Sequence, residues 1–544
     1  MKFLLLSVFT LVMSLGCEEI NTVNINTPAP GSVFQSGETV TVDVSGGSSF
    51  LWIEGNVFRK KHVQLTVPPV DGLGFIRAKV LTSTLLTVRS YLQGNFRKIE
   101  DYNSSTVQTR LGPGIMDGEG TTFASLCSEM MAGEELVEYM ENPIVVETEI
   151  AYIPVTININ ATSVLANSID VSIWFENGIL KFYSYLQNVV IVYTSEVSGV
   201  ESSGTAQYEW MEVSGDVVLT TNDSDLINMT ATASDPVITD DGGIPQQAFN
   251  LVIDKLDTAV CDAIATTTRN SSRVVFNTLM TTLVPQVVLE FENPISQDTK
   301  VEKLDVSGEN VSLSYKTLVE AQSPKVARGQ GVLERIHTDE SSEEVMSITF
   351  GSSLVNQIAY AVWDAGNTNN IIYTKNQLFE LGMSDMGGYY DRLETSEINL
   401  LLPPILEWDT QGPYLVMGGI QIIMSMDGAN DTTAHTAGRV PVKFSMEDNA
   451  LVLIRDEARE VEFFDVGFDR MSTLVDPDKV VKLLKTAVPG VVSDLFSTFP
   501  IIKMTSSNLA MLNGEPGPEV LTILESITVE ENFWRMNLSF EKIN

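Results

Sequence analysis

The sequence predicts an α+β protein in which a small all-β sandwich precedes two larger units built from helices and long antiparallel strands. Three observations predict this fold class. Short alternating strands broken by Gly, Pro and Asn occupy residues 21–83, long helical patterns separated by strand patterns follow from about residue 112, and that order recurs in the second half. With 544 residues, of which 44% are hydrophobic, the chain can bury several cores.

The first 17 residues predict an exported protein. Met1-Lys2 is a short basic start, and the apolar residues 3–15 are too few to span a bilayer. The following Gly16-Cys17 resembles the end of a bacterial lipobox, although Ser14 stands where an aliphatic residue is usual. Two interpretations stay open: a membrane-anchored lipoprotein acylated at Cys17 after removal of the signal peptide, or a secreted protein cleaved nearby.

Residues 21–83 contain the predicted sandwich. The stretch TVTVDVSG places Val40, Val42 and Val44 on one face of a strand, and Pro and Gly separate it from its neighbours. This pattern resembles the immunoglobulin-like modules of bacterial surface lipoproteins. The resemblance implies a spacer or stalk without chemistry of its own.

From about residue 112 the pattern changes to helices separated by long strands. The stretch TTFASLCSEMMAGEELVEYMENP predicts a helix that ends before Pro143. The strands in SIDVSIWFENGILKFYSYLQNVVIVY turn at Asn177-Gly178, a strong hairpin signal. A second helix is predicted from near Pro245, with apolar residues at helical spacing as far as Leu283.

The second half repeats this order. The stretch GSSLVNQIAYAVWDAG predicts a helix over Ser352–Ala365 that is apolar on most of its circumference, and strand patterns follow it. A last helix is predicted to begin at Asp476 as N-cap, with Pro477 at its first position and a kink at Pro489. The stretch EVLTILESITVEENFWRMNLSF then predicts closing strands.

Charge disfavours several classes of partner. Acidic residues number 71 and basic residues 33, for a formal charge of −38, and they are spread along the chain. Such a field keeps a protein soluble and repels polyanions, so nucleic acid is not expected as a partner. Anionic lipid headgroups are disfavoured for the same reason.

Motifs of catalysis and metal binding are missing from the sequence. It contains neither G-x-S-x-G nor H-E-x-x-H, and His62, His337 and His435 lie in different segments, where each is expected to be a polar surface residue. The acidic loop TNDSD at 221–225 could attract calcium but matches no complete loop motif, and a solvated turn is the favoured interpretation. We therefore expect no enzyme, no metal and no cofactor.

Two cysteines remain in the exported chain after Cys17. Cysteines in exported proteins usually pair, so a disulfide between Cys127 and Cys261 is expected, although the sequence does not give the distance between them.

Particular stretches resemble the family of bactericidal permeability-increasing protein, lipopolysaccharide-binding protein and cholesteryl ester transfer protein, the tubular lipid-binding superfamily. In GSSLVNQIAYAVWDAGNTNNIIYTKNQL the shared elements are the small residues before the helix, Asn356, Trp363 and the Ala365-Gly366 end. The stretch LLPPILEW and the helix that runs through Pro489 into FSTFPI are also similar. The stretch LDTAVCDAI resembles the cysteine-bearing helix of the family's first barrel.

The resemblance implies two elongated antiparallel β-barrels, each wrapped on long helices and joined by a central sheet. It implies the following boundaries: an N-terminal lipid-binding barrel at 112–300, a central-sheet linker at 301–340 and a C-terminal lipid-binding barrel at 341–544. It also assigns Cys261 to a disulfide. In the family, the cysteine that pairs with this helical cysteine lies in a strand. Cys127 is predicted to be helical, so the disulfide partner of Cys261 stays open.

The resemblance further implies lipid binding, and possibly lipid transfer, in apolar grooves between the helices and the curved sheets. The residues expected to line these grooves are Phe249, Val252, Leu256, Val260, Val355, Ile358, Ala359, Val362, Trp363, Leu483, Leu484 and Val488. Burial of methylene groups, at about 0.8 kcal/mol each, would hold the tails. The expected partner is phospholipid or neutral lipid, because the densest basic run, RKKH at 59–62, lies in the sandwich and not in a barrel.

Two alternatives stay open. Helices that are apolar all round are usually buried by protein on every side, so Val355, Ala359, Val362 and Trp363 could contact protein and not lipid. The whole chain could also be a β-rich surface adhesin or structural lipoprotein without a ligand cavity.

Overall fold

The computed structural model describes most of the chain. The described residues are 23–46, 49–53, 56–80, 86–94, 96–97, 102–150, 152–221, 223–240, 244, 248–284, 292–323, 332–333, 346–380, 392–428, 430–471, 476–478, 480–482, 484, 499–504, 506–510, 516–530 and 533–543. The predicted signal peptide with Cys17 lies outside them, as do His337, Leu483, Val488 and Pro489.

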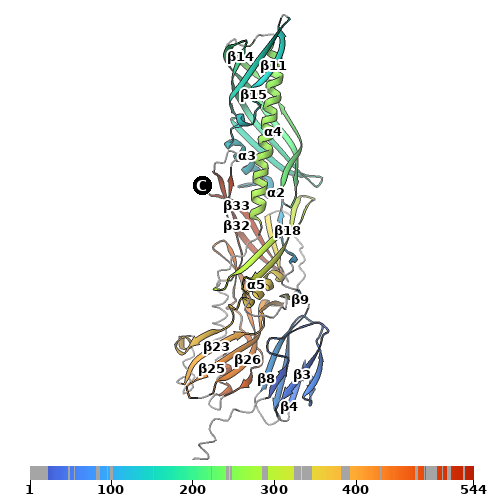
Figure 1. Ribbon diagram of the computed structural model, residues 1–544, viewed down its shortest axis with the longest axis vertical. Coiled ribbons are helices and arrows are strands. Elements are labelled where there is room, and N and C mark those ends of the chain that lie inside the picture. Colours follow the sequence, from blue (N-terminus) through green and yellow to red (C-terminus); the bar gives the residue numbers. More distant parts are fainter. Residues whose placement is uncertain are drawn as a thin grey trace, which may run out of the picture.

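The molecule is an elongated, β-rich rod with its sheets arranged along its length (Figure 1). A curled sheet with a long helix occupies one end, a central sheet follows, and a second curled sheet lies beside the N-terminal strands at the other end. The β-rich character predicted from the sequence is therefore confirmed.

Eight N-terminal strands form two facing sheets that share one apolar core. The first sheet contains β1 (Asn24–Thr27), β3 (Thr39–Ser45) and β6 (His62–Thr66), and the second contains β2 (Val33–Gln35), β8 (Leu86–Gly94), β7 (Gly72–Val80), β4 (Ser49–Ile53) and β5 (Asn56–Phe58). Val42 and Val44 of β3 are buried in this core, as the alternation predicts. The strands reach Gly94, beyond the predicted boundary at residue 83.

The N-terminal half is a curled antiparallel sheet with a long helix beside it (Figure 1). The helix α4 (Phe249–Thr282) has 34 residues, or about 51 Å at 1.5 Å per residue. Among the described strands, the edge strands β11 and β16 do not pair with each other, so the sheet is a half-barrel and not a closed barrel. Its strands are β11 (Ile144–Ile150), β12 (Ile153–Leu165), β14 (Ile179–Val197), β15 (Val200–Leu219) and β16 (Ser224–Ala233), with β13 (Ser168–Glu176) paired to β14 and β17 (Val237–Asp240) to β15.

Three short helical elements join this half to the rest of the chain. They are α2 (Pro113–Asp117), α3 (Phe123–Gly133) and the 3₁₀ helix η1 (Leu136–Tyr139). Thr122 caps α3 by accepting a hydrogen bond from the Ser125 amide, and Phe123 stacks on Phe276 of α4 with ring centroids 4.8 Å apart. The predicted helix is confirmed, and it stops earlier than Pro143 because Glu134 is extended.

The hairpin predicted at Asn177-Gly178 is confirmed. Glu176 pairs with Ile179, which leaves a two-residue turn in which Asn177 has φ 53° and Gly178 has φ 76°. Both values belong to the left-handed region that a type I′ turn requires.

We expect Gly178→Ala to reduce the stability of the β13–β14 hairpin by about 1–2 kcal/mol, since an L-residue is strained at this φ. An added Cβ would meet nothing within 4 Å, so the backbone alone accounts for the loss. Hydrogen exchange of the β13 and β14 amides measures it. Gly178→Asn is the matched control, because Asn tolerates this conformation, and an equal loss in both variants would contradict the explanation.

The central sheet draws its seven strands from distant parts of the chain and not from residues 301–340 alone. In spatial order they are β18 (Ile295–Ser307), β19 (Asn310–Ala321), β10 (Asn103–Leu111), β21 (Met346–Gly351), β33 (Phe533–Ile543), β32 (Pro516–Glu530) and β31 (Ser506–Ala510). The predicted closing strands are therefore confirmed as β32 and β33. Nearby, β9 (Phe96–Arg97) pairs with β20 (Val332–Leu333).

The C-terminal half is a second curled antiparallel sheet that begins after the helix α5 (Ser352–Asp364). Its strands are β22 (Ile371–Thr374), β23 (Leu393–Leu400), β25 (Gly412–Met426), β26 (Thr432–Glu447), β27 (Ala450–Arg455) and β30 (Phe499–Lys503), with β24 (Ile405–Asp409) paired to β25 and β28 (Glu462–Phe463) and β29 (Gly467–Arg470) paired to β26. The short helix α6 (Lys375–Leu378) follows β22. Asp476 accepts a hydrogen bond from the Asp478 amide at 3.1 Å, so it is the N-cap that the sequence predicts.

The N-terminal sandwich is docked against the C-terminal sheet through β8. The Gly419 amide donates to the Ser90 hydroxyl at 2.6 Å. The Thr87 hydroxyl, which donates to the Val23 carbonyl oxygen at 2.6 Å, also lies 3.2 Å from the Phe468 carbonyl oxygen. Phe75 lies against Phe464 with ring centroids 5.1 Å apart. These contacts join the sandwich to the body of the protein along a strand, which a flexible stalk would not do.

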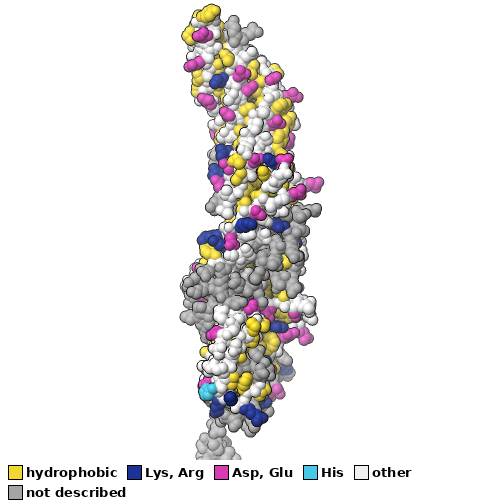
Figure 2. All heavy atoms as spheres, turned by 90° about the vertical axis from the view of Figure 1, so that its right-hand side faces the viewer, with side chains coloured by type: hydrophobic (Ala, Val, Ile, Leu, Met, Phe, Trp, Pro, Cys, Tyr) yellow, Lys and Arg dark blue, Asp and Glu magenta, His cyan; other side chains and the backbone are white. Residues whose placement is uncertain are grey.

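Acidic side chains are spread over the surface in the view of Figure 2, interspersed with fewer basic ones. No helix within the described part of the chain is both long enough and apolar enough to cross a membrane.

Candidate functional site

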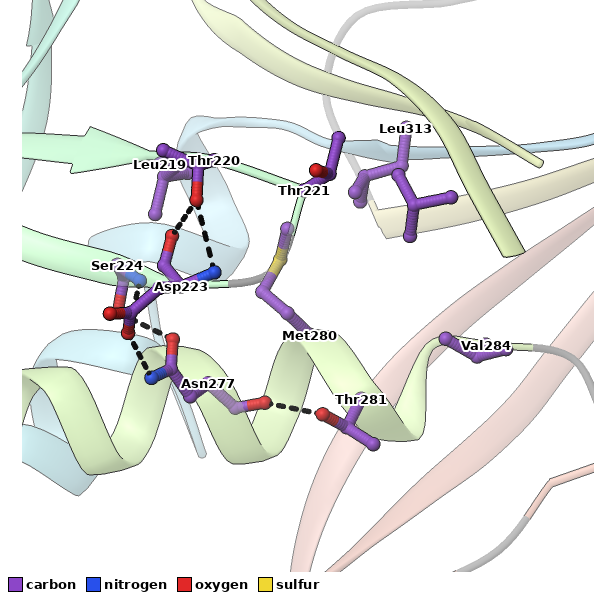
Figure 3. Close-up of a pocket in the computed structure, with 11 residues that line it drawn as sticks. Leu219, Thr220, Thr221, Asp223, Ser224, Asn277, Met280, Thr281, Val284 and Leu313 are labelled. Carbon is purple, nitrogen blue, oxygen red and sulfur yellow. Dashed lines mark hydrogen bonds between the residues drawn. The ribbon is translucent and has the colours of Figure 1, made fainter. Parts of the chain in front are cut away.

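A pocket lies where the end of α4 meets the central sheet, and we call it the junction pocket (Figure 3). Its volume is about 260 Å³. Its walls come from the β15–β16 connection, from the last turns of α4 and from β18 and β19. The lining residues are Leu219, Thr220, Thr221, Asp223, Ser224, Asn277, Met280, Thr281, Val284, Val301 and Leu313.

One end of the junction pocket is polar and consists of Thr220, Asp223, Ser224 and Asn277. The Asn277 amide nitrogen donates to the Asp223 carboxylate at 2.7 Å, and the Ser224 hydroxyl donates to the Asn277 side-chain oxygen at 2.8 Å. The Thr220 hydroxyl donates to the Asp223 carbonyl oxygen at 2.8 Å and accepts from the Asp223 amide at 3.0 Å. Figure 3 shows these side chains bonded together beside α4, so the polar end is held in a fixed arrangement.

The other end is apolar and consists of Met280, Val284, Val301 and Leu313. All four belong to the main hydrophobic core or pack against it. In Figure 3 the Met280 side chain lies between the polar group and Leu313. The junction pocket is therefore amphipathic along its length.

Two arginines of α4 form ion pairs beside the polar end. Arg273 donates to Asp223 through both Nε, at 2.9 Å, and a terminal nitrogen, and Arg269 forms the same two-pronged pair with Asp225. The Arg273 hydrogen bonds, followed by the bond from Asn277, lower the pKa of Asp223 to about 2. Asp223 is therefore ionised at neutral pH.

The described residues of the loop TNDSD are not part of a cluster of possible metal ligands. Its Asp223 and Asp225 are occupied by arginines, and in the described residues no three His, Cys, Asp or Glu side chains group as they would around a metal ion. The favoured interpretation of a solvated turn was incomplete, because residues of this loop line the pocket. The sequence did contain one signal for this pocket. The polar residues Asn277 and Thr281 interrupt the apolar pattern of the predicted helix.

The residues predicted to line a groove on α4 lie far along the helix from the junction pocket. Val252, Leu256 and Val260 are fully buried in the main core, and the side chain of Phe249 lies outside the described residues. None of the predicted groove residues is among those that line the junction pocket.

The residues predicted on α5 are packed on every side, because all 13 residues of this helix are buried. Val355, Ile358, Ala359, Val362 and Trp363 lie in it, and the indole nitrogen of Trp363 donates to the Leu400 carbonyl oxygen at 2.6 Å. Leu484 is buried in the same core. Contact of these residues with lipid stays a prediction.

Cys127 and Cys261 are free thiols, so the predicted disulfide between them is wrong for this structure. Cys127 is buried inside α3, where desolvation holds the pKa of its thiol well above the usual range. Cys261 is only half-buried on α4, where burial, followed by the charges of Asp257 and Asp262, raises the pKa of its thiol to about 11. Neither thiol is activated as a nucleophile.

A second polar cluster lies in the joint between the sandwich and the C-terminal sheet. The expectation that His435 is a surface residue is wrong: it is buried on β26, and its Nε2 lies 2.9 Å from the Asp469 carboxylate. Arg89 of β8 donates two hydrogen bonds to the same carboxylate, at 2.7 and 3.0 Å. Residues 434–438 of β26 are all buried, so no alternation in the sequence marked this histidine as inward-facing, and the sequence could not show its partners. His62, in contrast, is exposed.

Comparisons with known proteins give only remote likenesses. No family model matches the sequence, and no curated protein matches it. A crystal structure of lipopolysaccharide binding protein is 9% identical, with a TM-score of 0.45, and the match covers 81% of this chain and all of that one. P47 from Clostridium botulinum A2 is 7% identical with a TM-score of 0.25, covering 79% and 96% of the two chains, and P47 of Clostridium botulinum E1 is 8% identical with a TM-score of 0.18, covering 80% and 99%. At such scores the likenesses decide neither the activity nor the family of this chain, and the family resemblance stays a prediction.

Proposed function

We propose that the protein binds lipid and holds a hydrocarbon chain in the junction pocket. The observation that carries this proposal is the amphipathic lining: Met280, Val284, Val301 and Leu313 at one end and a bonded polar group at the other. Small-molecule sites are concave and combine apolar walls with a few fixed polar groups, and this pocket has both features.

The size of the pocket limits what it can hold. Its volume of about 260 Å³ lies just below the roughly 300–1,000 Å³ of drug-sized sites. A segment of one chain fits this volume better than a whole two-tailed lipid does. Each buried methylene contributes about 0.8 kcal/mol, so a few of them give measurable binding.

Exposed apolar residues at the far end of the N-terminal half support a lipid role. Tyr152 and Ile153 are exposed at the β11–β12 turn, and Val200 is exposed at the β14–β15 turn. Ile157 pairs with Val197, so the two turns lie at the same end of the sheet, where Figure 2 shows hydrophobic side chains at the tip. Such a tip would suit contact with a lipid surface. Lipid transfer, export and acylation of Cys17 belong to the same proposal.

We expect Met280→Trp to weaken lipid binding at least tenfold, because the larger side chain fills the junction pocket from α4. The measurement is equilibrium dialysis of radiolabelled monolauroylglycerol and laurate, each below its micelle concentration. Mass spectrometry of lipid extracted from the purified full chain gives an independent readout.

Thr266→Trp is the matched control, since it adds the same indole to an exposed position of α4 outside the pocket. It should leave the affinity within twofold. If neither probe binds saturably, or if both variants bind as the unaltered protein does, the proposed function fails. The β-rich adhesin without a ligand would then be the better hypothesis.

A further inference from the structure

The polar end of the junction pocket has most of its hydrogen-bond donors already engaged. A carboxylate only accepts, so the Asn277 nitrogen faces Asp223 and its oxygen faces Ser224. The Ser224 hydroxyl therefore donates to Asn277, and the Thr281 hydroxyl donates to the Asn277 carbonyl oxygen at 2.7 Å. Both hydroxyls can meet a ligand only as acceptors, and one amide hydrogen of Asn277 is left as a donor, beside the hydroxyl of the lining residue Thr221.

The charges of the polar end are balanced within the protein. No lysine, arginine or histidine is among the residues that line the junction pocket, and its one charged lining residue is Asp223. Arg273, which pairs with this lining residue, uses two nitrogens on that carboxylate. A ligand with a negative head would meet the Asp223 carboxylate there, with no cation among the described lining residues to compensate.

We propose, on the basis of the proposed function, that the junction pocket selects single-chain amphiphiles with an uncharged, hydroxyl-bearing head. A hydroxyl can both donate to Ser224, Thr281 or Asp223 and accept from Asn277, whereas a fully ionised carboxylate or phosphate head has no hydrogen to donate and can only accept. The pairing of Arg273 with Asp223 is the feature that excludes anions. The chain lies toward Met280 and Leu313, and the head lies at the polar end.

A variant of the full chain in which Arg273 no longer pairs with Asp223 tests this selectivity. Asp223→Asn keeps the shape of the side chain but removes its charge, so Arg273 becomes available to a negative head. We expect the affinity for laurate to rise at least tenfold in this variant. The unaltered protein should prefer monolauroylglycerol to laurate by at least tenfold.

Asp225→Asn is the matched control, because it releases Arg269, which pairs with Asp225 and is not among the lining residues. Laurate binding should stay within twofold in this variant. In the double variant Asp223→Asn/Arg273→Gln the gain should disappear, which shows that the arginine and not a general loss of negative charge is responsible. Circular dichroism and thermal unfolding of each variant establish that the fold is kept.

The outcomes separate the two proposals. Equal affinity of the unaltered protein for laurate and monolauroylglycerol, or no gain of laurate binding in Asp223→Asn, overturns the head-group inference while Met280→Trp still reports a functional pocket. Absence of binding by both probes overturns the proposed function itself.

Discussion

Replacement of Asp469 by alanine is expected to destabilise the joint between the sandwich and the C-terminal sheet by about 3–5 kcal/mol, because it leaves Arg89 and His435 without their shared carboxylate. The Arg89 side chain is only 9% exposed, so water cannot replace the lost partner fully. Hydrogen exchange of the β8 and β26 amides in the full chain measures the loss.

A neighbouring ion pair supplies the control. Arg77 pairs with Asp465 across the same joint, but the two side chains are 31% and 47% exposed, and exposed pairs contribute less than about 1 kcal/mol. Asp465→Ala should therefore have a small effect. Equal effects of the two substitutions would show that the joint does not depend on the buried cluster.

The same cluster predicts a loss of stability in acid. Burial opposes ionisation of Asp469, but hydrogen bonds and charge from His435 and then Arg89 outweigh it and lower its pKa from 3.8 to about 2. Because the pKa of Asp469 is lower in the folded than in the unfolded protein, its ionised form stabilises the fold. This stabilisation is complete at pH values above the unfolded pKa and should be lost as the pH falls from about 4 through 2. In Asp469→Asn this part of the pH dependence should be missing from acid unfolding curves.

Trp363→Ala is expected to lower the stability of the C-terminal half by about 3–5 kcal/mol, since Trp363 is almost completely buried in α5. Its ring also lies against Tyr360 with centroids 5.4 Å apart, and its indole nitrogen bonds to Leu400. Urea unfolding of the full chain, with hydrogen exchange of the α5 amides, measures the change.

Trp363→Phe separates packing from hydrogen bonding. It keeps an aromatic ring but removes the hydrogen bond to the buried Leu400 carbonyl oxygen, so the loss should be about 1–3 kcal/mol. If Trp363 contacted an acyl chain, as the family resemblance implies, Trp363→Ala would reduce lipid content with little loss of stability. That result would contradict the packing explanation and restore α5 as part of a groove.

The elements that sequence reasoning predicted are those with local causes. The turn at Asn177-Gly178, the N-cap at Asp476 and the period of α4 each depend on residues within a few positions of one another. The apolar circumference of α5 predicted burial, and every residue of that helix is buried. Local pattern was sufficient for these elements because neighbouring residues determine backbone conformation and amphipathic faces.

The candidate site could not be predicted in the same way. The junction pocket brings residues 219–224 together with Asn277, Val301 and Leu313, and only the folded sheet places them side by side. The partners of His435 were hidden for the same reason, since Asp469 and Arg89 come from β29 and β8. The cysteine pairing failed because composition and cellular compartment do not determine the distance between two helices.

The order of strands in the central sheet constrains when this protein can fold. Val107 of β10 pairs with Phe350 of β21, and Met346 of β21 pairs with Leu538 of β33. Pairings over such sequence separations are slow, because a long loop must close before any hydrogen bond forms. During synthesis, β21 therefore has no neighbour on one side until the ribosome has released residues 533–543. The middle of the rod is thus completed last, and until then its unpaired edges are exposed to aggregation.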